Sequence, residues 1–301
     1  MKSLIRKSPL FYVGDKYKLM KQLLGLFPPE INNFFEPFVG GGTVFLNIKA
    51  KKYFLNDINI RLIAIHKFLV NQARTPEKLY AAVEKIVKKY KLSRSYAEDI
   101  VPATLKLKFK KTFYAKFNQD GYNKLKACFN KANSLDPLTL YILLIYGFNR
   151  MLRFNLAGKF NLPVGNVDFN KNVVNALNGY FDFVIGKKLV FTSQDFRPFL
   201  LKREFQKNDF VYLDPPYLIG ASEYNKLWNI KLEEALLQTL DTLNLKGVKF
   251  ALSNLTHYNK SKNELLLTWM SKYKVHNINS RYISYHNNNE KKLKEVLITN
   301  Y

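Results

Sequence analysis

The chain has 301 residues and carries 48 Lys and Arg against 23 Asp and Glu, which gives a formal net charge of +25. Because 47% of the residues are hydrophobic and 15% are aromatic, the chain can bury a sizeable core, and its composition excludes disorder as the main state. The excess of positive charge indicates a polyanionic partner such as nucleic acid, an anionic membrane surface or ribosomal RNA, and charge alone does not choose among them.

Targeting and redox features narrow the class of protein. Residues 1–9 are basic, but no apolar stretch with a small-residue cleavage site follows, so secretion is not indicated. A single cysteine, Cys128, excludes an intrachain disulfide and a cysteine-cluster metal site. The nearly uncharged run 137–149 is shorter than the roughly 20 residues that span a bilayer, and we expect it to form a buried helix. We therefore expect a reduced, intracellular protein.

The first pattern along the chain is strand, glycine turn, helix and strand. A strand-like segment at 33–38 precedes three glycines, Gly40–Gly42, and a second strand-like segment at 53–57 follows an apolar stretch. This order is typical of a nucleotide-binding βαβ unit, in which the glycine turn lets a ligand approach the backbone. Asp57, at the end of the second strand, suits the hydroxyls of a ribose. The pattern predicts a nucleoside cofactor, and a turn that serves only packing is the alternative.

A helical, lysine-rich stretch follows, from about residue 62 to residue 168. Between Lys78 and Lys131 there are 14 Lys and Arg against four acids, interleaved with Tyr and Phe. Such a surface suits the phosphates of nucleic acid, which give affinity that depends on salt and not on sequence. A solvated helical face is the alternative. We expect this stretch to be an insertion into the sheet.

Strand-like segments return at 189–192, 210–213, 248–252 and 296–299. Leucines at helical spacing over residues 232–243 predict an amphipathic helix between the second and third of these segments. Apolar strands that alternate with helices predict an α/β fold with a doubly wound, mostly parallel sheet. Its functional residues are expected at the carboxyl ends of the strands.

The most specific motif is Asp214-Pro215-Pro216-Tyr217, directly after the segment 210–213. The two prolines fix the backbone and donate no ladder hydrogen bonds, so the chain leaves the sheet stiffly at this point. The carboxylate of Asp214 and the carbonyl of Pro215 can accept the two N–H bonds of an exocyclic amine, while Tyr217 stacks on the base. A turn that only ends the strand is the alternative.

Four motifs together resemble those of the Dam-type DNA adenine-N6 methyltransferases, the D12 class or alpha group. They are Phe11-Tyr12-Val13-Gly14-Asp15-Lys16, Glu36-Pro37-Phe38-Val39-Gly40-Gly41-Gly42, Asn56-Asp57-Ile58-Asn59 and Asp214-Pro215-Pro216-Tyr217. The similarity extends to residues 146–155, 158–165 and 252–254 and so spans nearly the whole chain. It implies a Rossmann-like class I methyltransferase fold, with a catalytic domain at 1–61 and 170–301 and a helical target-recognition domain at 62–169.

The resemblance also implies the cofactor, S-adenosylmethionine, and the residues that bind it. Tyr12 and Lys16 match residues that contact this cofactor, with the lysine near its methionyl carboxylate, and Asp57 matches the residue that binds its ribose. The segment Ser193–Phe196 matches the residues that hold its adenine ring. The expected cofactor-binding residues are Tyr12, Lys16, Glu36, Phe38, Gly40, Asp57, Asp195, Phe196 and Asp214. The expected catalytic residues are Asp214, Pro215, Pro216 and Tyr217.

The expected DNA-binding residues are Met151, Arg153, Asn155 and Pro163. Arg153 would suit a guanine, whose O6 and N7 accept both arms of a guanidinium, and the resemblance implies the site GATC. The segment Asn287–Lys292 is similar to a loop near the target base in the family, and a disordered hairpin tip is the alternative.

Two departures from the family pattern bear on the first motif. Asp15 stands where a second glycine is usual, which adds an acid near the methionyl end of the cofactor. Phe11 stands where bacterial relatives often carry a lysine, so we expect no base contact from a lysine there.

We therefore expect S-adenosylmethionine-dependent methylation of adenine N6 in double-stranded DNA at a short site, with the target base flipped out of the duplex. Methylation of cytosine N4 is a close alternative, although the fourth motif begins with Asp and that class often has Ser. A catalytically silent DNA-binding protein is the alternative from another class, and RNA methylation is a weaker one. Methylation of cytosine C5 is excluded because Cys128 is not preceded by proline.

The expected partners follow from this reaction. Double-stranded DNA is the substrate, a cognate restriction endonuclease that acts separately is a candidate partner, and no membrane partner is expected. We expect a monomer in the cytoplasm of a bacterial cell or a phage-infected host. No metal is expected, because the histidines show no paired ligand spacing; they are His66, His257, His276 and His286.

Overall fold

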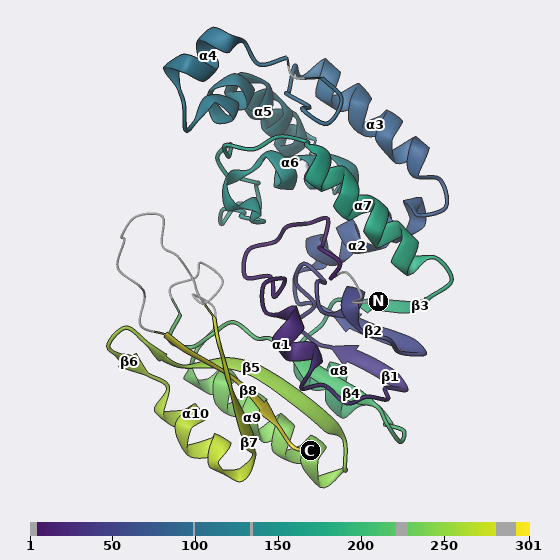
Figure 1. Ribbon diagram of the computed structural model, residues 1–301, viewed down its shortest axis with the longest axis vertical. Helices are drawn as coiled ribbons and strands as arrows, with labels where there is room; N and C mark the ends of the chain where they lie inside the picture. The colour runs from purple at the N-terminus through teal and green to yellow at the C-terminus, as the bar shows by residue number, and fades with distance from the viewer. Residues whose placement is uncertain (1–4, 99, 133–134, 221–227, 281–292) are drawn as a thin grey trace. The chain divides into compact units, whose positions relative to one another are not determined.

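The structure is a computed structural model that describes residues 5–98, 100–132, 135–220, 228–280 and 293–301. The segment Asn287–Lys292, expected near the target base, lies outside these residues, as does His286. The chain divides into two compact units, whose helices and strands are labelled in Figure 1. We call residues 1–17, 40–46 and 59–187 the helical unit, and residues 18–39, 47–58 and 188–301 the sheet unit.

The sheet unit is built on an eight-stranded sheet of order β3-β2-β1-β4-β5-β8-β7, with β6 paired to β5. The strands are β1 (Asn33–Glu36), β2 (Lys52–Asn56), β3 (Lys188–Thr192), β4 (Phe210–Leu213), β5 (Lys249–Tyr258), β6 (Ser261–Lys262), β7 (Lys274–Ile278) and β8 (Leu293–Thr299). Strands β1 to β5 pair in parallel, whereas β8 runs antiparallel to β5 and β7. The predicted α/β fold with a mostly parallel sheet is confirmed.

Three of the four described helices of the sheet unit, all those after β3, pack on one face of this sheet through an apolar cluster. The helices of the unit are α1 (Met20–Leu24), α8 (Phe196–Leu201), α9 (Ile230–Leu245) and α10 (Glu264–Trp269), with the 3-10 turn η4 (Met270–Lys272). Leu236, Leu240 and Leu243 of α9 are fully buried in the cluster, which confirms the predicted amphipathic helix. Side chains alternate along a strand, so Tyr212 of β4 lies on the opposite face, where its ring centroid is 5.3 Å from that of Phe27.

The helical unit contains all the helices that the structure describes between β2 and β3. These are α2 (Ile60–Gln72), α3 (Pro76–Lys89), α4 (Ala103–Lys108), α5 (Phe113–Lys131), α6 (Pro137–Tyr146), the 3-10 turn η2 (Phe148–Arg150) and α7 (Lys171–Val184). A further 3-10 turn, η1 (Phe45–Asn47), follows the three glycines. The predicted buried helix is α6, whose residues 140–146 are all buried. Among the described helices, none is long and apolar enough to cross a membrane.

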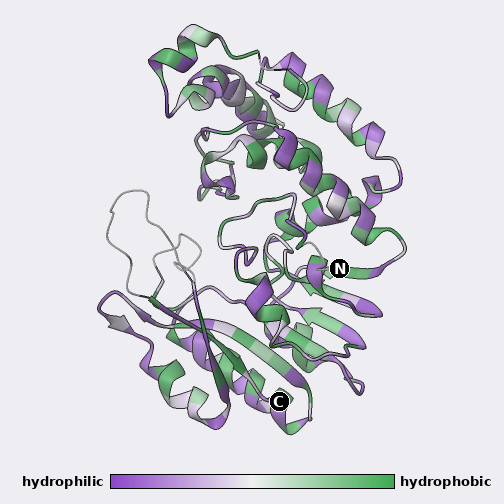
Figure 2. Cartoon of the chain, viewed as in Figure 1, coloured by the Kyte–Doolittle hydropathy of each residue, from purple (hydrophilic) through white to green (hydrophobic). Residues whose placement is uncertain are grey.

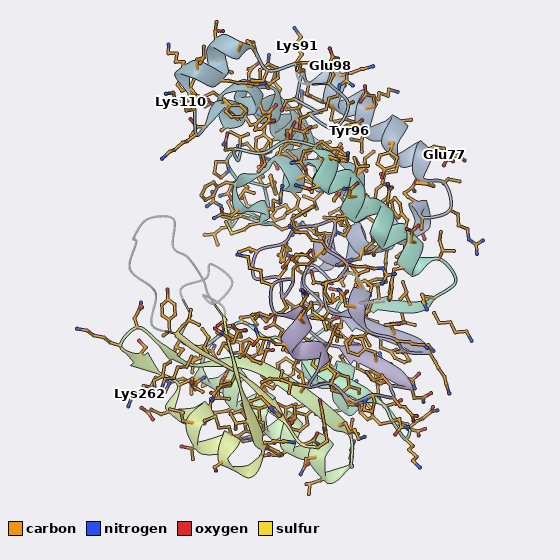
Figure 3. The ribbon with its side chains drawn as sticks, viewed as in Figure 1. Glu77, Lys91, Tyr96, Glu98, Lys110 and Lys262 are labelled. Atoms are coloured by element: carbon orange, nitrogen blue, oxygen red, sulfur yellow. The ribbon has the colours of Figure 1, made fainter. Side chains whose placement is uncertain are left out.

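Helices of the helical unit contain both polar and apolar residues. The two kinds alternate along α3 and α7 in Figure 2, as expected for helices with one buried face. Eleven of the 14 basic residues between Lys78 and Lys131 are exposed, among them Lys91 and Lys110, which are labelled in Figure 3. The functional domain bounds at 62 and 169 lie inside this unit and stay a prediction.

Candidate active site

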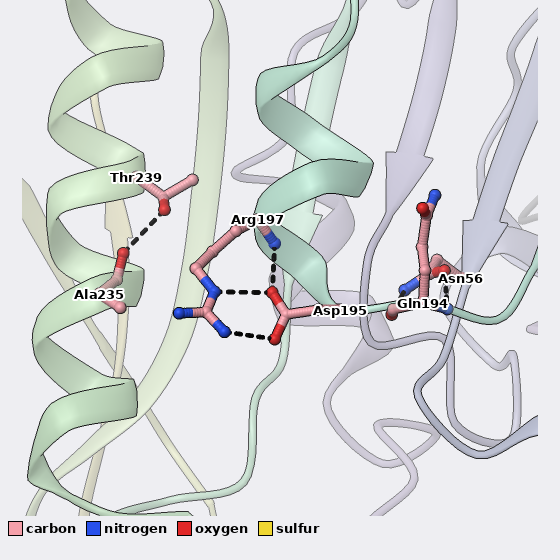
Figure 4. A network of polar contacts seen from close by, with 6 residues as sticks. All are labelled: Asn56, Gln194, Asp195, Arg197, Ala235 and Thr239. Atoms are coloured by element: carbon pink, nitrogen blue, oxygen red, sulfur yellow. Dashed lines mark hydrogen bonds and ion pairs between the residues drawn. The ribbon is translucent and has the colours of Figure 1, made fainter.

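The side-chain amide of Asn56 joins the carboxyl ends of three strands. Its Nδ2 donates to the carbonyl oxygens of Pro37, 3.1 Å away, and Gln194, 2.9 Å away. Its Oδ1 accepts from the Gln194 N–H at 3.1 Å and from the Thr192 hydroxyl at 2.9 Å. Figure 4 shows the contacts between Asn56 and Gln194. Asn56 is fully buried, so its polar atoms need these partners, and the loops after β1, β2 and β3 are tied together.

Three expected cofactor residues follow these strands at one edge of the sheet. Phe38 comes two residues after β1, Asp57 directly after β2 and Asp195 three residues after β3. The Asp57 N–H donates to the carbonyl oxygen of Thr192 at 3.3 Å. Because β1, β2 and β3 are neighbouring parallel strands, the sheet brings these residues to the same edge. Glu36, the last residue of β1, is 2% exposed.

An aromatic cluster lies beside this edge. The ring centroid of Phe38 is 5.4 Å from that of Phe196 and 5.7 Å from that of Trp228, and the last two are 6.0 Å apart. Trp228 was missed from the sequence, because nothing near it in the chain links it to the first strand. Its indole N–H donates to Glu233 at 2.6 Å, and Glu233 is fully buried. The cluster offers an apolar wall for a planar ring.

Asp195 caps helix α8 and pairs with Arg197. Its Oδ1 accepts from the Arg197 backbone N–H and from Nε, each at 2.8 Å, and its Oδ2 accepts from Nη2 at 2.8 Å (Figure 4). The hydrogen bonds from Arg197 lower the pKa of Asp195 below its usual range, against the effect of burial. The carboxylate is therefore charged at neutral pH, and it caps the N-terminus of the helix.

The Asp214–Tyr217 segment leaves the sheet from β4, between the ends of β1 and β5. The hydroxyl of Tyr217 lies 3.0 Å from Asp214 Oδ1 and 3.2 Å from Glu295 Oε1. Glu295 belongs to β8 and is 2% exposed. Sequence reasoning missed Glu295, because 78 residues separate it from Tyr217 and only the register of β8 brings the two together.

The three glycines lie in the helical unit beside the first motif. A Cβ at Gly41 would lie 2.9 Å from the Cβ of Tyr12, and a Cβ at Gly42, whose φ is +81°, would lie 2.3 Å from a ring carbon of Phe45. Real side chains do not approach this closely, so close packing accounts for both glycines. A cofactor contact of Gly40 stays a prediction.

A buried histidine supports the same turn. The Nε2 of His66 lies 2.8 Å from the carbonyl oxygen of Gly40, and its Nδ1 lies 3.4 Å from the Tyr180 hydroxyl. Burial lowers the pKa of His66 to about 4, so the ring is neutral at pH 7. A carbonyl oxygen only accepts, and Nε2 therefore carries the proton. His66 is a core residue, as the lack of ligand spacing indicated.

The first motif places a carboxylate close to an expected cofactor-binding lysine. Burial raises the pKa of Asp15, while the Tyr17 N–H, 2.9 Å from its Oδ1, and the charges of Lys7 and Lys16 oppose that rise. Lys16 is 4% exposed. The acid that replaces the usual glycine is thus partly compensated by neighbouring positive charge.

The expected DNA-binding residues lie on or beside a hairpin over residues 153–161. Arg153 donates from Nε to Asn161 Oδ1 at 3.0 Å and from Nη2 to the Asn161 carbonyl oxygen at 2.9 Å. These two bonds to Asn161 use the Nε and Nη2 edge of the guanidinium and do not involve the Nη1 donors. Asn155 is exposed, and its Oδ1 accepts from the Lys159 N–H at 2.9 Å. Pro163 is exposed and Met151 is buried.

Comparison with known proteins identifies the family. The family model described as D12 class N6 adenine-specific DNA methyltransferase matches residues 12–283, which is most of the chain. The chain belongs to this family. The resemblance drawn from the four motifs is thereby confirmed, and the mostly parallel sheet, in which β6 and β8 run antiparallel to β5, agrees with the class I methyltransferase fold.

Individual relatives in this family match almost the whole chain. Modification methylase StsI of Streptococcus sanguinis is 36% identical over 309 residues, and type II methyltransferase M.FokI of Planomicrobium okeanokoites is 35% identical over 304 residues. Each alignment covers 98% of this chain and 43% of the relative, so the chain spans less than half the length of these two proteins. The DNA adenine methylase of Escherichia coli strain K12 is 26% identical, over 96% of this chain and 93% of its own length.

Proposed function

We propose that this member of the D12 class transfers a methyl group from S-adenosylmethionine to N6 of adenine in double-stranded DNA. The observation that carries the proposal is the Asp214–Tyr217 segment directly beyond β4, at the edge of the sheet where the expected cofactor residues of the sheet unit also lie. The names of two relatives, modification methylase and DNA adenine methylase, support the same class of reaction.

The residues at the strand ends fit S-adenosylmethionine. The aromatic cluster of Phe38, Phe196 and Trp228 suits an adenine ring, and Asp57 suits the ribose hydroxyls. The other proposed cofactor-binding residues are Tyr12, Lys16, Glu36, Gly40, Asp195 and Asp214. When bound, this cofactor supplies a methyl group on a sulfonium, which is electrophilic enough to react without a metal ion.

Asp214 and Pro215 would hold the exocyclic amine of the target adenine. Two acceptor oxygens on its two N–H bonds keep the nitrogen lone pair out of the ring and direct it toward the methyl group. Alignment of this kind lowers a barrier by roughly 7–11 kcal/mol when the reacting atoms are well placed. Pro216 stiffens the segment, and the ring of Tyr217 contacts the base. The amine is paired inside a duplex, so the base must be flipped out.

We propose that Arg153 recognises guanine in the site GATC, with Met151, Asn155 and Pro163 beside it. The Nη1 donors that Asn161 leaves available support this role. The exposed lysines of the helical unit would hold the phosphates of the duplex. We propose that the protein acts as a monomer in the bacterial cytoplasm and that any cognate restriction endonuclease acts separately.

Transfer of tritium from labelled S-adenosylmethionine to duplex DNA tests the reaction, followed by digestion to nucleosides and chromatography. We expect the label in N6-methyladenine, and label in N4-methylcytosine would favour the alternative amine. No transfer, together with no calorimetric binding of S-adenosylmethionine, would indicate a silent DNA-binding protein. Methylation of a random-sequence library, mapped by single-molecule sequencing, tests the site GATC.

A further inference from the structure

One hydroxyl group faces two carboxylates at the end of β4. The Tyr217 hydroxyl is 3.0 Å from Asp214 Oδ1 and 3.2 Å from Glu295 Oε1. Both are hydrogen-bonding distances, but a hydroxyl has one proton and a carboxylate accepts only. The hydroxyl therefore donates to one of the two carboxylates at a time, and the two bonds are alternatives.

Glu295 reaches this position from a strand that runs against the others. It pairs with Leu255 of β5 and Ile278 of β7. Its neighbour Val296 belongs to the apolar cluster under α9, so the alternation of side chains puts Glu295 on the opposite face of the sheet. A charged carboxylate is costly to bury unless polar groups compensate it, and the Tyr217 hydroxyl is one such group.

The two bonds have different consequences for the proposed reaction. When the hydroxyl donates to Asp214 Oδ1, it competes with the amine of the adenine for that acceptor. When it donates to Glu295, this competition ends. A bond to a charged carboxylate is about twice as strong as one to a neutral acceptor, so the presence of a second carboxylate decides how easily the hydroxyl leaves Asp214.

We propose that Glu295 is a positioning residue for the methyl transfer. It takes the hydrogen bond of Tyr217 when the target base arrives, and so removes the competition of that hydroxyl with the amine N–H for Asp214 Oδ1. This role rests on the proposed function. No covalent bond changes and no proton is transferred: one hydrogen bond moves from Asp214 to Glu295, and the amine replaces it.

A double-mutant cycle with Glu295→Gln and Tyr217→Phe tests this role. The glutamine has the same shape but is neutral, so the hydroxyl stays on Asp214, and the single-turnover methylation rate is expected to fall about tenfold. The KM for S-adenosylmethionine and the Kd for duplex are expected to stay unchanged. Tyr217→Phe keeps the ring and removes the competing hydroxyl. Adding it to Glu295→Gln is therefore expected to restore most of the lost rate.

Rescue of the methylation rate in the double variant is the decisive outcome. If Glu295 were only structural, the rate losses of the two single variants would add in the double variant. Additive losses, or an equal rise in KM and fall in kcat, would overturn the role of Glu295 and leave the proposed function intact. A wild type that transfers no methyl group to DNA would overturn both. Should Glu295→Gln not fold, Glu295→Asp shortens the side chain and is expected to show the same rescue by Tyr217→Phe.

The chain offers a matched control elsewhere in the sheet unit. Asp241 of α9 accepts from the Tyr273 hydroxyl at 2.6 Å, from the Trp269 N–H at 2.9 Å and from Lys272 at 2.9 Å. Asp241→Asn neutralises a carboxylate that, like Glu295, accepts from a tyrosine hydroxyl. This pair is not at the end of β4. The variant is expected to lower the melting temperature without changing the single-turnover rate. A tenfold loss of rate in this variant as well would show that the Glu295→Gln effect is one of general stability and would contradict the proposal.

Discussion

The side-chain nitrogen of Asn56 lies 2.9 Å from the carbonyl oxygen of Gln194, which joins the end of β2 to the loop after β3. The same nitrogen also donates to Pro37, after β1. One buried amide thus holds together the three loops that carry the expected cofactor residues of the sheet unit.

We expect Asn56→Ala to weaken S-adenosylmethionine binding at least about tenfold and to lower the free energy of unfolding by about 2–4 kcal/mol, because several buried partners lose their hydrogen bonds. Calorimetry and chemical denaturation measure the two effects. Asn118→Ala is the control, since Asn118 is also fully buried and bonds Ser93 in the helical unit. It is expected to lose stability but to keep cofactor affinity. Equal weakening of cofactor binding by both variants would contradict a special role for Asn56.

Asp214→Ala is expected to reduce turnover by roughly 100- to 1,000-fold, the cost of removing one preorganised polar contact to the reacting group. Duplex binding, measured by fluorescence anisotropy, is expected to survive. Loss of methylation and duplex binding together would instead mark Asp214 as a residue needed for folding.

His66 makes stability depend on pH in a defined window. The pKa of His66 is about 4 in the folded chain against 6.5 for the ordinary side chain, so as pH falls the unfolded chain binds the proton first. The stabilisation that comes from neutral His66 is complete above pH 6.5 and is lost as the pH falls to about 4. The loss lowers the free energy of unfolding by up to about 3 kcal/mol. Chemical denaturation at about pH 7.5 and about pH 4.5 measures it. His66→Gln, which still has an N–H donor for Gly40, is expected to show a smaller pH dependence, and an unchanged pH dependence would exclude His66 as its source.

Arg153→Ala is expected to relax the choice of base at one position of the site by about 1–3 kcal/mol, because a guanidinium that pairs with guanine is lost. Lys110→Ala, which removes an exposed charge from the helical unit, is the contrasting variant. It is expected to weaken binding to all DNA sequences alike. The slope of the logarithm of the binding constant against the logarithm of the salt concentration is expected to fall in magnitude by about one. Sequencing of a methylated random library and binding at several salt concentrations distinguish the two effects. A site unchanged by Arg153→Ala would contradict its role in base recognition.

Local patterns predicted much of the sheet. Strands β1, β2, β3 and β4 are short apolar segments between turn residues, so each was predicted within a residue or two of its bounds. Strand β7 was not predicted, because Lys274–Ile278 has mostly exposed, polar residues and lies at the edge of the sheet. Edge strands lack the continuous apolar sequence that marks a strand buried on both faces.

The candidate site was predicted where its residues are adjacent in sequence and missed where register brings them together. Asp214 and Tyr217 lie in one motif, and the prolines between them indicated a stiff exit from the sheet. Trp228 and Glu295 are distant from their partners along the chain, and nothing in their local sequence distinguishes them from ordinary core or strand residues. Asn56 was noticed only as the neighbour of Asp57, although its amide holds the loops.

Strand β8 enters the sheet between β5 and β7, antiparallel to both. During folding, a chain in which β8 has not yet inserted has an unpaired edge along β5, which is a template for aggregation. The same intermediate lacks Glu295 beside Tyr217. Under the role proposed for Glu295, late insertion of this strand would leave a chain that both has an aggregation-prone edge and lacks the carboxylate that draws the Tyr217 hydroxyl away from Asp214.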